Sequence, residues 1–118
     1  MAIEVLFAIF PQLALLDVVG PAEVFATTNQ VLGRELYRSR AGAITGTPLV
    51  AGESGLELAV TVDLRRARTP DTLIVAGGTG YREAIADAEL LAVLRRLAPR
   101  PRRLASVCTG AFVLAEIG

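Results

Sequence analysis

The chain has 118 residues, of which 53% are hydrophobic and 20% charged, which suits one globular domain and excludes a disordered chain. Its 12 basic and 12 acidic residues cancel, so no net charge attracts nucleic acid or an anionic membrane. Since the chain has no histidine and one cysteine, Cys108, it cannot form an internal disulfide or a His/Cys metal site. We therefore expect neither a metal nor a cofactor.

The N-terminal residues do not resemble a targeting segment, because they lack a basic start and lead directly into a strand-like run. No apolar run approaches the ~18 residues that a membrane span requires. We expect a cytoplasmic protein with no membrane partner.

Three short apolar runs, residues 3–10, 72–76 and 104–107, predict the central strands of a parallel sheet that is buried on both faces. Between them, the sequence predicts a strand over 36–44 and a hairpin that joins 48–50 to 55–58. A short helical turn is expected over 63–67.

Helical patterns alternate with these strands. One helix should begin at Gly20-Pro21 and end at Gly33, with an apolar face of Val24, Phe25, Thr28, Val31 and Leu32. A second should run from the N-cap Asp87 to Pro99, with an apolar face of Leu90, Leu91, Leu94, Leu97 and Ala98. A third should begin at Thr109-Gly110 and carry Phe112, Val113 and Leu114. The alternation predicts a three-layer α/β fold with right-handed crossovers.

Ligands of an open parallel sheet bind beyond the carboxyl ends of its strands. Three segments of interest lie at such ends, residues 11–20, 77–80 and 108–110. We expect the fold to bring them together at one edge.

Cys108 lies at a predicted strand-to-helix turn, with the small residues Ser106 and Gly110 two positions to either side. This pattern is typical of a nucleophile elbow, in which the first turn of the helix stabilises a thiolate. The alternative is a buried structural thiol. The flanking small residues favour the elbow.

Two other features lie at the same edge. Asp17, between apolar neighbours, is either a helix cap or a partly buried acid, and its spacing favours the cap. The glycine-rich run 77–80 is either a flexible turn or a loop whose N–H groups approach an oxyanion. It does not match a phosphate-binding loop.

These segments together resemble the ThiJ/PfpI superfamily, whose fold is flavodoxin-like and related to class I glutamine amidotransferases. The resemblance rests on residues 15–25, on the glycine loop, and on Ser106-Val107-Cys108-Thr109-Gly110-Ala111-Phe112. It covers the whole chain and is strongest to two branches. These are the amidase-like N-terminal domain of AraC-type transcriptional regulators and the isonitrile hydratases.

The resemblance implies that Cys108 is the nucleophile, Asp17 its acidic partner, and Thr109 an assisting residue. It implies that the backbone N–H groups of Gly78 and Thr109 are oxyanion donors, and that the protein is a homodimer that binds a small molecule. Residues 1–118 form a single domain that we expect to be incomplete at its C-terminus, because family domains continue beyond the elbow helix. The apolar faces of Phe112, Val113 and Leu114 should then be uncovered.

Two functions fit the resemblance. One is a ligand-sensing domain of an AraC-type regulator, whose DNA-binding part would follow residue 118, so that this chain alone would not bind DNA. The other is an isonitrile hydratase-like enzyme, which would convert isonitriles to N-substituted formamides. Both stand, since Asp17, Cys108 and Thr109 are expected in either. In both, Asp17 should lie within hydrogen-bond reach of the Cys108 sulfur.

Overall fold

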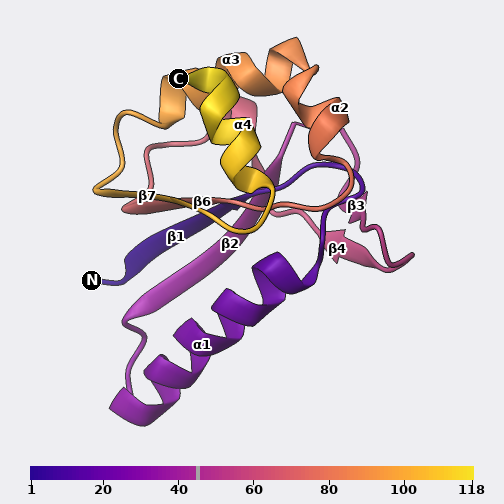
Figure 1. The fold of residues 1–118 in the computed structure, drawn as a ribbon. Coiled ribbons are helices and arrows are strands. Elements are labelled where there is room, and N and C mark those ends of the chain that lie inside the picture. Colours follow the sequence, from indigo (N-terminus) through magenta and orange to yellow (C-terminus); the bar gives the residue numbers. More distant parts are fainter. Residues whose placement is uncertain (45) are drawn as a thin grey trace.

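A computed structural model describes residues 1–44 and 46–118 as a parallel sheet with helices on both faces (Figure 1). The sheet has five strands in the order β5-β2-β1-β6-β7, all parallel. In chain order they are β1 (Ile3–Ala8), β2 (Tyr37–Ala43), β5 (Val62–Asp63), β6 (Thr72–Val75) and β7 (Arg103–Ser106). The predicted α/β class and parallel sheet are confirmed.

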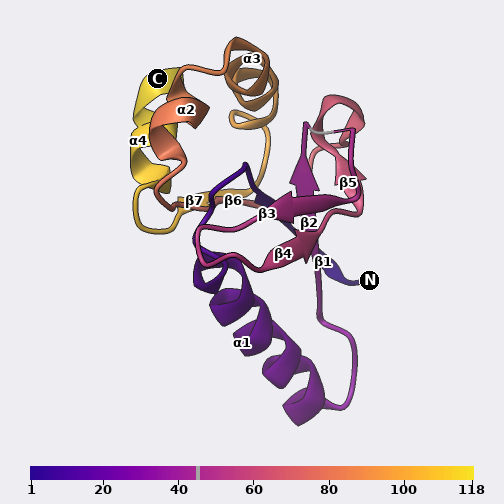
Figure 2. The same cartoon turned by 90° about the vertical axis from the view of Figure 1, so that its right-hand side faces the viewer.

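Within the described residues, helix α1 (Leu16–Leu32) covers one face of the sheet (Figures 1 and 2). The other face is covered by α2 (Tyr81–Ile85), α3 (Ala88–Leu97) and α4 (Gly110–Ile117). The predicted hairpin is present as β3 (Leu49–Ala51) paired with β4 (Glu57–Ala59), and the predicted helical turn as η1 (Leu64–Arg66). These elements complete the three layers.

β1 lies at the centre of the sheet, as its apolar sequence predicts. Every side chain from Val5 to Phe10 is at most 5% exposed, and alternate residues pack into the cores on the two faces. β6 is likewise buried from Leu73 to Val75.

The expectation of a central strand at residues 104–107 is wrong. Within the described residues β7 is the outermost strand, pairing with β6 alone, and Leu104 is 45% exposed. A run of four residues, one of which is the polar Ser106, is too short a signal to separate an edge strand from a central one.

α3 follows its sequence pattern closely. The Asp87 carboxylate caps the helix by accepting hydrogen bonds from the Glu89 and Leu90 N–H groups, both at 3.1 Å. Four leucines of the predicted face, Leu90, Leu91, Leu94 and Leu97, are buried in the core. The apolar spacing and the cap therefore predict this helix correctly.

α1 differs from its prediction in two respects. It begins at Leu16, and Pro21 lies inside it although the proline nitrogen cannot donate the usual helical hydrogen bond. Its predicted apolar face is divided, because Val24, Val31 and Leu32 are 64%, 80% and 49% exposed, whereas Phe25 packs against the core on this side of the sheet. Val18 is the buried residue of the helix. The predicted stop at Gly33 is confirmed by its left-handed φ of 67°.

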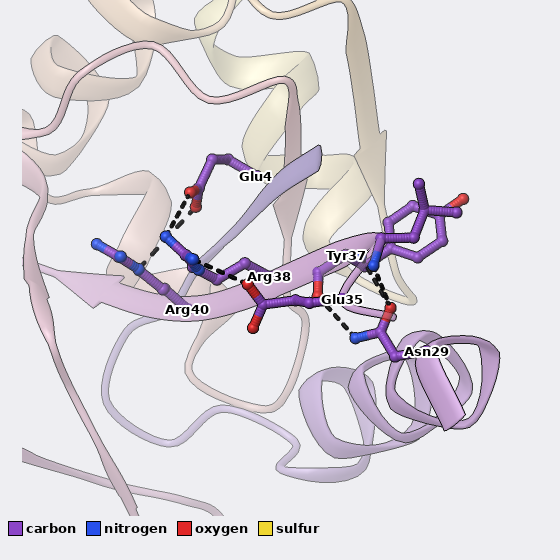
Figure 3. Close-up of polar contacts among 7 residues, drawn as sticks. Glu4, Asn29, Glu35, Tyr37, Arg38 and Arg40 are labelled. Atoms are coloured by element: carbon purple, nitrogen blue, oxygen red, sulfur yellow. Dashed lines mark hydrogen bonds and ion pairs between the residues drawn. The ribbon is translucent and has the colours of Figure 1, made fainter. Parts of the chain in front are cut away.

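Asn29 joins α1 to the start of β2 (Figure 3). Its side-chain oxygen accepts hydrogen bonds from the Leu36 and Tyr37 N–H groups at 2.9 Å, and its nitrogen donates to the Tyr37 carbonyl at 2.8 Å. The rings of Phe25 and Tyr37 pack nearby, with centroids 4.7 Å apart. These contacts hold the last turns of α1 against the start of β2.

α4 is better covered than the sequence predicts. Val113 is fully buried in the core, so the expectation that it lacks cover is wrong. Phe112 is 55% exposed and packs against Tyr81, with ring centroids 5.3 Å apart.

Candidate functional site

Segments that follow different strands meet at the carboxyl edge of the sheet, as expected. The segment after β1 is bonded to the glycine loop after β6: the Ala14 N–H donates to the Gly77 carbonyl at 2.8 Å, and the Gly80 N–H donates to the Gln12 carbonyl at 3.0 Å. The β3–β4 hairpin joins them, because the Glu53 N–H donates to the Leu13 carbonyl at 2.9 Å. Backbone hydrogen bonds therefore link the three segments that form this edge.

Cys108 occupies the turn between β7 and α4 with a φ of 54°, a left-handed conformation that is uncommon outside glycine. The Val107 N–H still donates to the Val75 carbonyl at 3.0 Å, and the Gly110 N–H already donates to the Val107 carbonyl at 3.0 Å. The chain thus changes from strand to helix within two residues. The Cys108 thiol is exposed, so a buried structural thiol is excluded.

The glycines beside Cys108 allow this close packing. A Cβ at Gly110 would collide with the Val75 carbonyl oxygen, and a Cβ at Gly77 would lie 2.7 Å from the Thr109 nitrogen. Gly78 has a φ of 129° and faces the Ala14 nitrogen. A side chain at Gly77 would therefore push the loop away from the elbow, one at Gly78 would collide with the segment after β1, and one at Gly110 would collide with the end of β6.

Asp17 is directed toward the glycine loop. One carboxylate oxygen accepts a hydrogen bond from the Gly77 N–H at 3.0 Å, and no side chain caps α1. The helix-cap interpretation of Asp17 is therefore wrong. Within the described residues no hydrogen bond joins Asp17 to the Cys108 sulfur, so the expected hydrogen bond between them is not formed. Its role as the acidic partner stays a prediction.

Two hydrogen bonds join the Thr109 side chain to the backbone of Gly78. Its hydroxyl accepts from the Gly78 N–H at 2.9 Å and donates to the Gly78 carbonyl at 3.1 Å. One of the two predicted oxyanion donors is therefore already occupied. The other, the Thr109 N–H, makes no hydrogen bond in the part of the chain that the structure describes.

Glu53 is a residue at this edge that the sequence analysis missed. Its carboxylate accepts from the Thr79 N–H at 2.9 Å, across 26 positions of sequence. A glutamate in a hairpin turn gives no signal of such a contact. Three consecutive N–H groups of the loop, Gly77, Gly78 and Thr79, are thus held by side chains from three segments, Asp17, Thr109 and Glu53.

Two kinds of site find no support in the described part of the chain. No three acidic, cysteine or histidine side chains gather within residues 1–44 and 46–118 as a metal would need. Over the same residues, no helix is both long and apolar enough to cross a membrane.

A parallel sheet whose last strand leads through a strained cysteine into a helix defines a class of α/β domains with an elbow at the sheet edge. Residues 3–118 match the DJ-1/PfpI family, and the chain belongs to that family. A ThiJ/PfpI family protein from Pseudomonas syringae has the same flavodoxin-like fold, with a TM-score of 0.86 at 24% identity. The match covers 99% of this chain and 46% of that one.

Relatives identified by sequence differ in kind. The chain is 40% identical over 115 residues to an uncharacterized protein from the cpoL 5′ region of Streptomyces lividans, covering 98% of this chain and 79% of the relative. It is 30% identical to the isonitrile hydratase of Pseudomonas putida, covering 100% of this chain and 49% of that enzyme. It is 31% identical to the HTH-type transcriptional regulator GbdR of Pseudomonas aeruginosa, covering 95% of this chain and 30% of the regulator. The chain thus spans half or less of the two relatives whose function is named.

Proposed function

We propose that these residues form the ligand-sensing domain of an AraC-type transcriptional regulator. The likeness to GbdR supports this proposal, and so does the geometry at the sheet edge. The ligand would be a small molecule bound beside Cys108, at the edge where open α/β sheets bind ligands. We expect no specific DNA binding from these residues alone, because their net charge is zero.

The observation that carries the proposal is the hydrogen bond from the Gly78 N–H to the Thr109 hydroxyl, at 2.9 Å. Stabilising an oxyanion requires donors already aimed at the position where charge develops. At this edge the Gly78 donor is satisfied by the protein itself, and Asp17 is bonded to Gly77 rather than to the thiol. These hydrogen bonds would fix the conformation of the glycine loop as a binding surface, and they would not activate the Cys108 thiol.

The alternative is isonitrile hydration, and the exposed, strained Cys108 is the observation that favours it. The thiol would add across the terminal carbon of the isonitrile, forming a sulfur–carbon bond and placing its proton on that carbon. Water would then displace the sulfur, leaving an N-substituted formamide and the free thiol. Asp17 would carry the protons, which requires it to exchange its bond to Gly77 for one to the reacting groups.

An assay of formamide production separates the two functions. The full chain and its Cys108→Ser variant are incubated with a simple aryl isonitrile, and N-aryl formamide is measured against time. Sensing predicts equal, background rates for both proteins. A rate that depends on Cys108 would assign the chain to the hydratases.

We further propose that the sensing domain is a homodimer in contact through α1. The exposed side chains of Val24, Val31 and Leu32 support this, since they form an apolar strip on the face directed away from the sheet. Light scattering after size-exclusion chromatography should give a dimeric mass for the wild type and a monomeric mass for Val31→Glu. A matched substitution on the same helix, Gln30→Glu, should remain dimeric.

A further inference from the structure

A cleft lies away from Cys108 and contains no residue of the glycine loop or the elbow. It has a volume of about 560 Å³ and is bounded by the first half of β1, by β5, and by the segment between η1 and β6. Its size is in the ordinary range of small-molecule sites. Apolar walls are provided by Leu6, Val62, Ala67 and Pro70.

The acidic side chains of this cleft are already paired. Glu4 lies 3.4 Å from one guanidinium nitrogen of Arg38 and 4.0 Å from Nε of Arg40 (Figure 3). Asp63 accepts hydrogen bonds from the Arg65 backbone N–H at 3.0 Å and from Arg65 Nε at 3.1 Å. Both carboxylates therefore have an arginine as their nearest partner, and Asp63 interacts with Arg66 only through a smaller charge effect.

Two arginines of the cleft have no such partner. Arg66 and Arg68 both line it, and neither guanidinium group makes a hydrogen bond or an ion pair within residues 1–44 and 46–118. With Arg40 held only by a contact at 4.0 Å, the cleft has an excess of positive charge beside apolar walls.

The segment that carries Arg66 and Arg68 is fixed from behind by α3. The Arg96 guanidinium donates hydrogen bonds to the carbonyls of Leu64 at 3.1 Å, Arg65 at 3.3 Å and Ala67 at 3.4 Å. The backbone between the two arginines therefore does not have to be ordered when a ligand binds, which lowers the cost of binding.

We propose that this cleft binds a small organic anion, a carboxylate or a phosphate with an apolar body. The planar guanidinium groups of Arg66 and Arg68 suit the oxygens of either anion, and the apolar walls suit the body. Because both arginines are exposed, the affinity should fall as salt is raised. The proposal is independent of any chemistry at Cys108.

The test is a titration of the full, ¹⁵N-labelled chain with phenyl phosphate and, separately, with benzoate, followed by backbone amide shifts. We expect saturable shifts in residues 4–6 and 61–69, and the stronger of the two probes identifies the anion class. Inorganic phosphate should bind more weakly than phenyl phosphate because it has no apolar body, and benzylamine should not shift these residues.

Variants then test the arginines. Arg66→Ala with Arg68→Ala should weaken the stronger probe about tenfold or more, whereas Arg34→Ala, on the loop after α1, should change its affinity less than about twofold. The amide spectrum of each variant shows directly whether it is folded. The proposal is overturned if neither anion gives saturable shifts there, if benzylamine binds as well, or if the folded double variant binds like the wild type.

Discussion

The two ends of the sheet are held together by different kinds of contact. At the carboxyl edge, the glycine loop is bonded to its neighbours through short backbone and side-chain hydrogen bonds, such as that from the Gly77 N–H to Asp17 at 3.0 Å. At the other end, long exposed side chains form ion pairs, such as Arg38 with Glu4 at 3.4 Å. Contacts of the first kind fix geometry, whereas water and salt weaken the second.

The largest effect should come from filling a glycine of the carboxyl edge. In Gly78→Ala the new Cβ would strike the Ala14 nitrogen, at a φ of 129° that side chains rarely adopt. We expect a loss of about 3 kcal/mol or more in the free energy of unfolding, measured by urea denaturation. Gly33→Ala is the control, since its φ is 67° but no atom lies within 4 Å, and it should lose only about 1 kcal/mol. Equal losses would contradict a tightly interlocked edge.

Removing the Asp17 carboxylate should have the next largest effect. Asp17→Ala leaves the N–H of the buried Gly77 without an acceptor, and we expect a loss of about 1–2 kcal/mol in the free energy of unfolding. Asp17→Asn keeps an acceptor oxygen and should lose less. Because Asp17 is bonded to the loop, we also expect Asp17→Asn to leave the rate of Cys108 alkylation by iodoacetamide unchanged. A large change in that rate would place Asp17 at the sulfur.

Removing the ion pair between Arg38 and Glu4, at the amino end of the sheet, should lower the free energy of unfolding by a smaller amount. Arg38 and Glu4 have side chains 46% and 40% exposed, so we expect Arg38→Ala to lose less than about 1 kcal/mol in urea denaturation. Raising the salt concentration should reduce the difference from the wild type further. A loss as large as that of Asp17→Ala would show that the two ends are equally rigid.

The smallest effect concerns Asp63. Hydrogen bonds from Arg65 hold the pKa of Asp63 below its ordinary value, with smaller charge effects of Arg65 and Arg66. Such a carboxylate stabilises the fold above its unfolded-state pKa, and this contribution is lost as the pH falls through the lower folded-state value. The melting temperature of the wild type should therefore fall slightly more on acidification than that of Asp63→Asn. Parallel curves would mean that the Asp63–Arg65 contact does not stabilise the fold.

The sequence predicts well those features that depend on residues within one helix, and less well those that depend on tertiary contacts. In α3, the cap residue and the apolar spacing act within one helix, and both are confirmed. In α1, the same kind of apolar spacing groups exposed and packed residues together, since Val31 is 80% exposed whereas Phe25 packs against the core. Spacing defines a face of a helix, but what that face packs against depends on the tertiary structure.

The functional site likewise combines features that the local sequence predicts with contacts that it does not predict. The strained turn at Cys108 and the need for glycines beside it follow from local sequence, and the structure has both. The partners of the loop do not, because Asp17 and Glu53 reach it across 60 and 26 positions. Only the fold brings those carboxylates to the loop, so local spacing assigned Asp17 to a helix cap and gave Glu53 no role.

Hydrogen exchange at the Gly78 amide tests most directly whether this N–H group is held by the Thr109 hydroxyl. The Gly78 N–H donates to the Thr109 hydroxyl at 2.9 Å, whereas the Gly77 N–H donates to Asp17. We predict that Gly78 is protected in the wild type and that Thr109→Val removes this protection while that of Gly77 persists. If Gly78 exchanges equally fast in both proteins, its N–H is free to serve as an oxyanion donor, and the sensing account loses its main support.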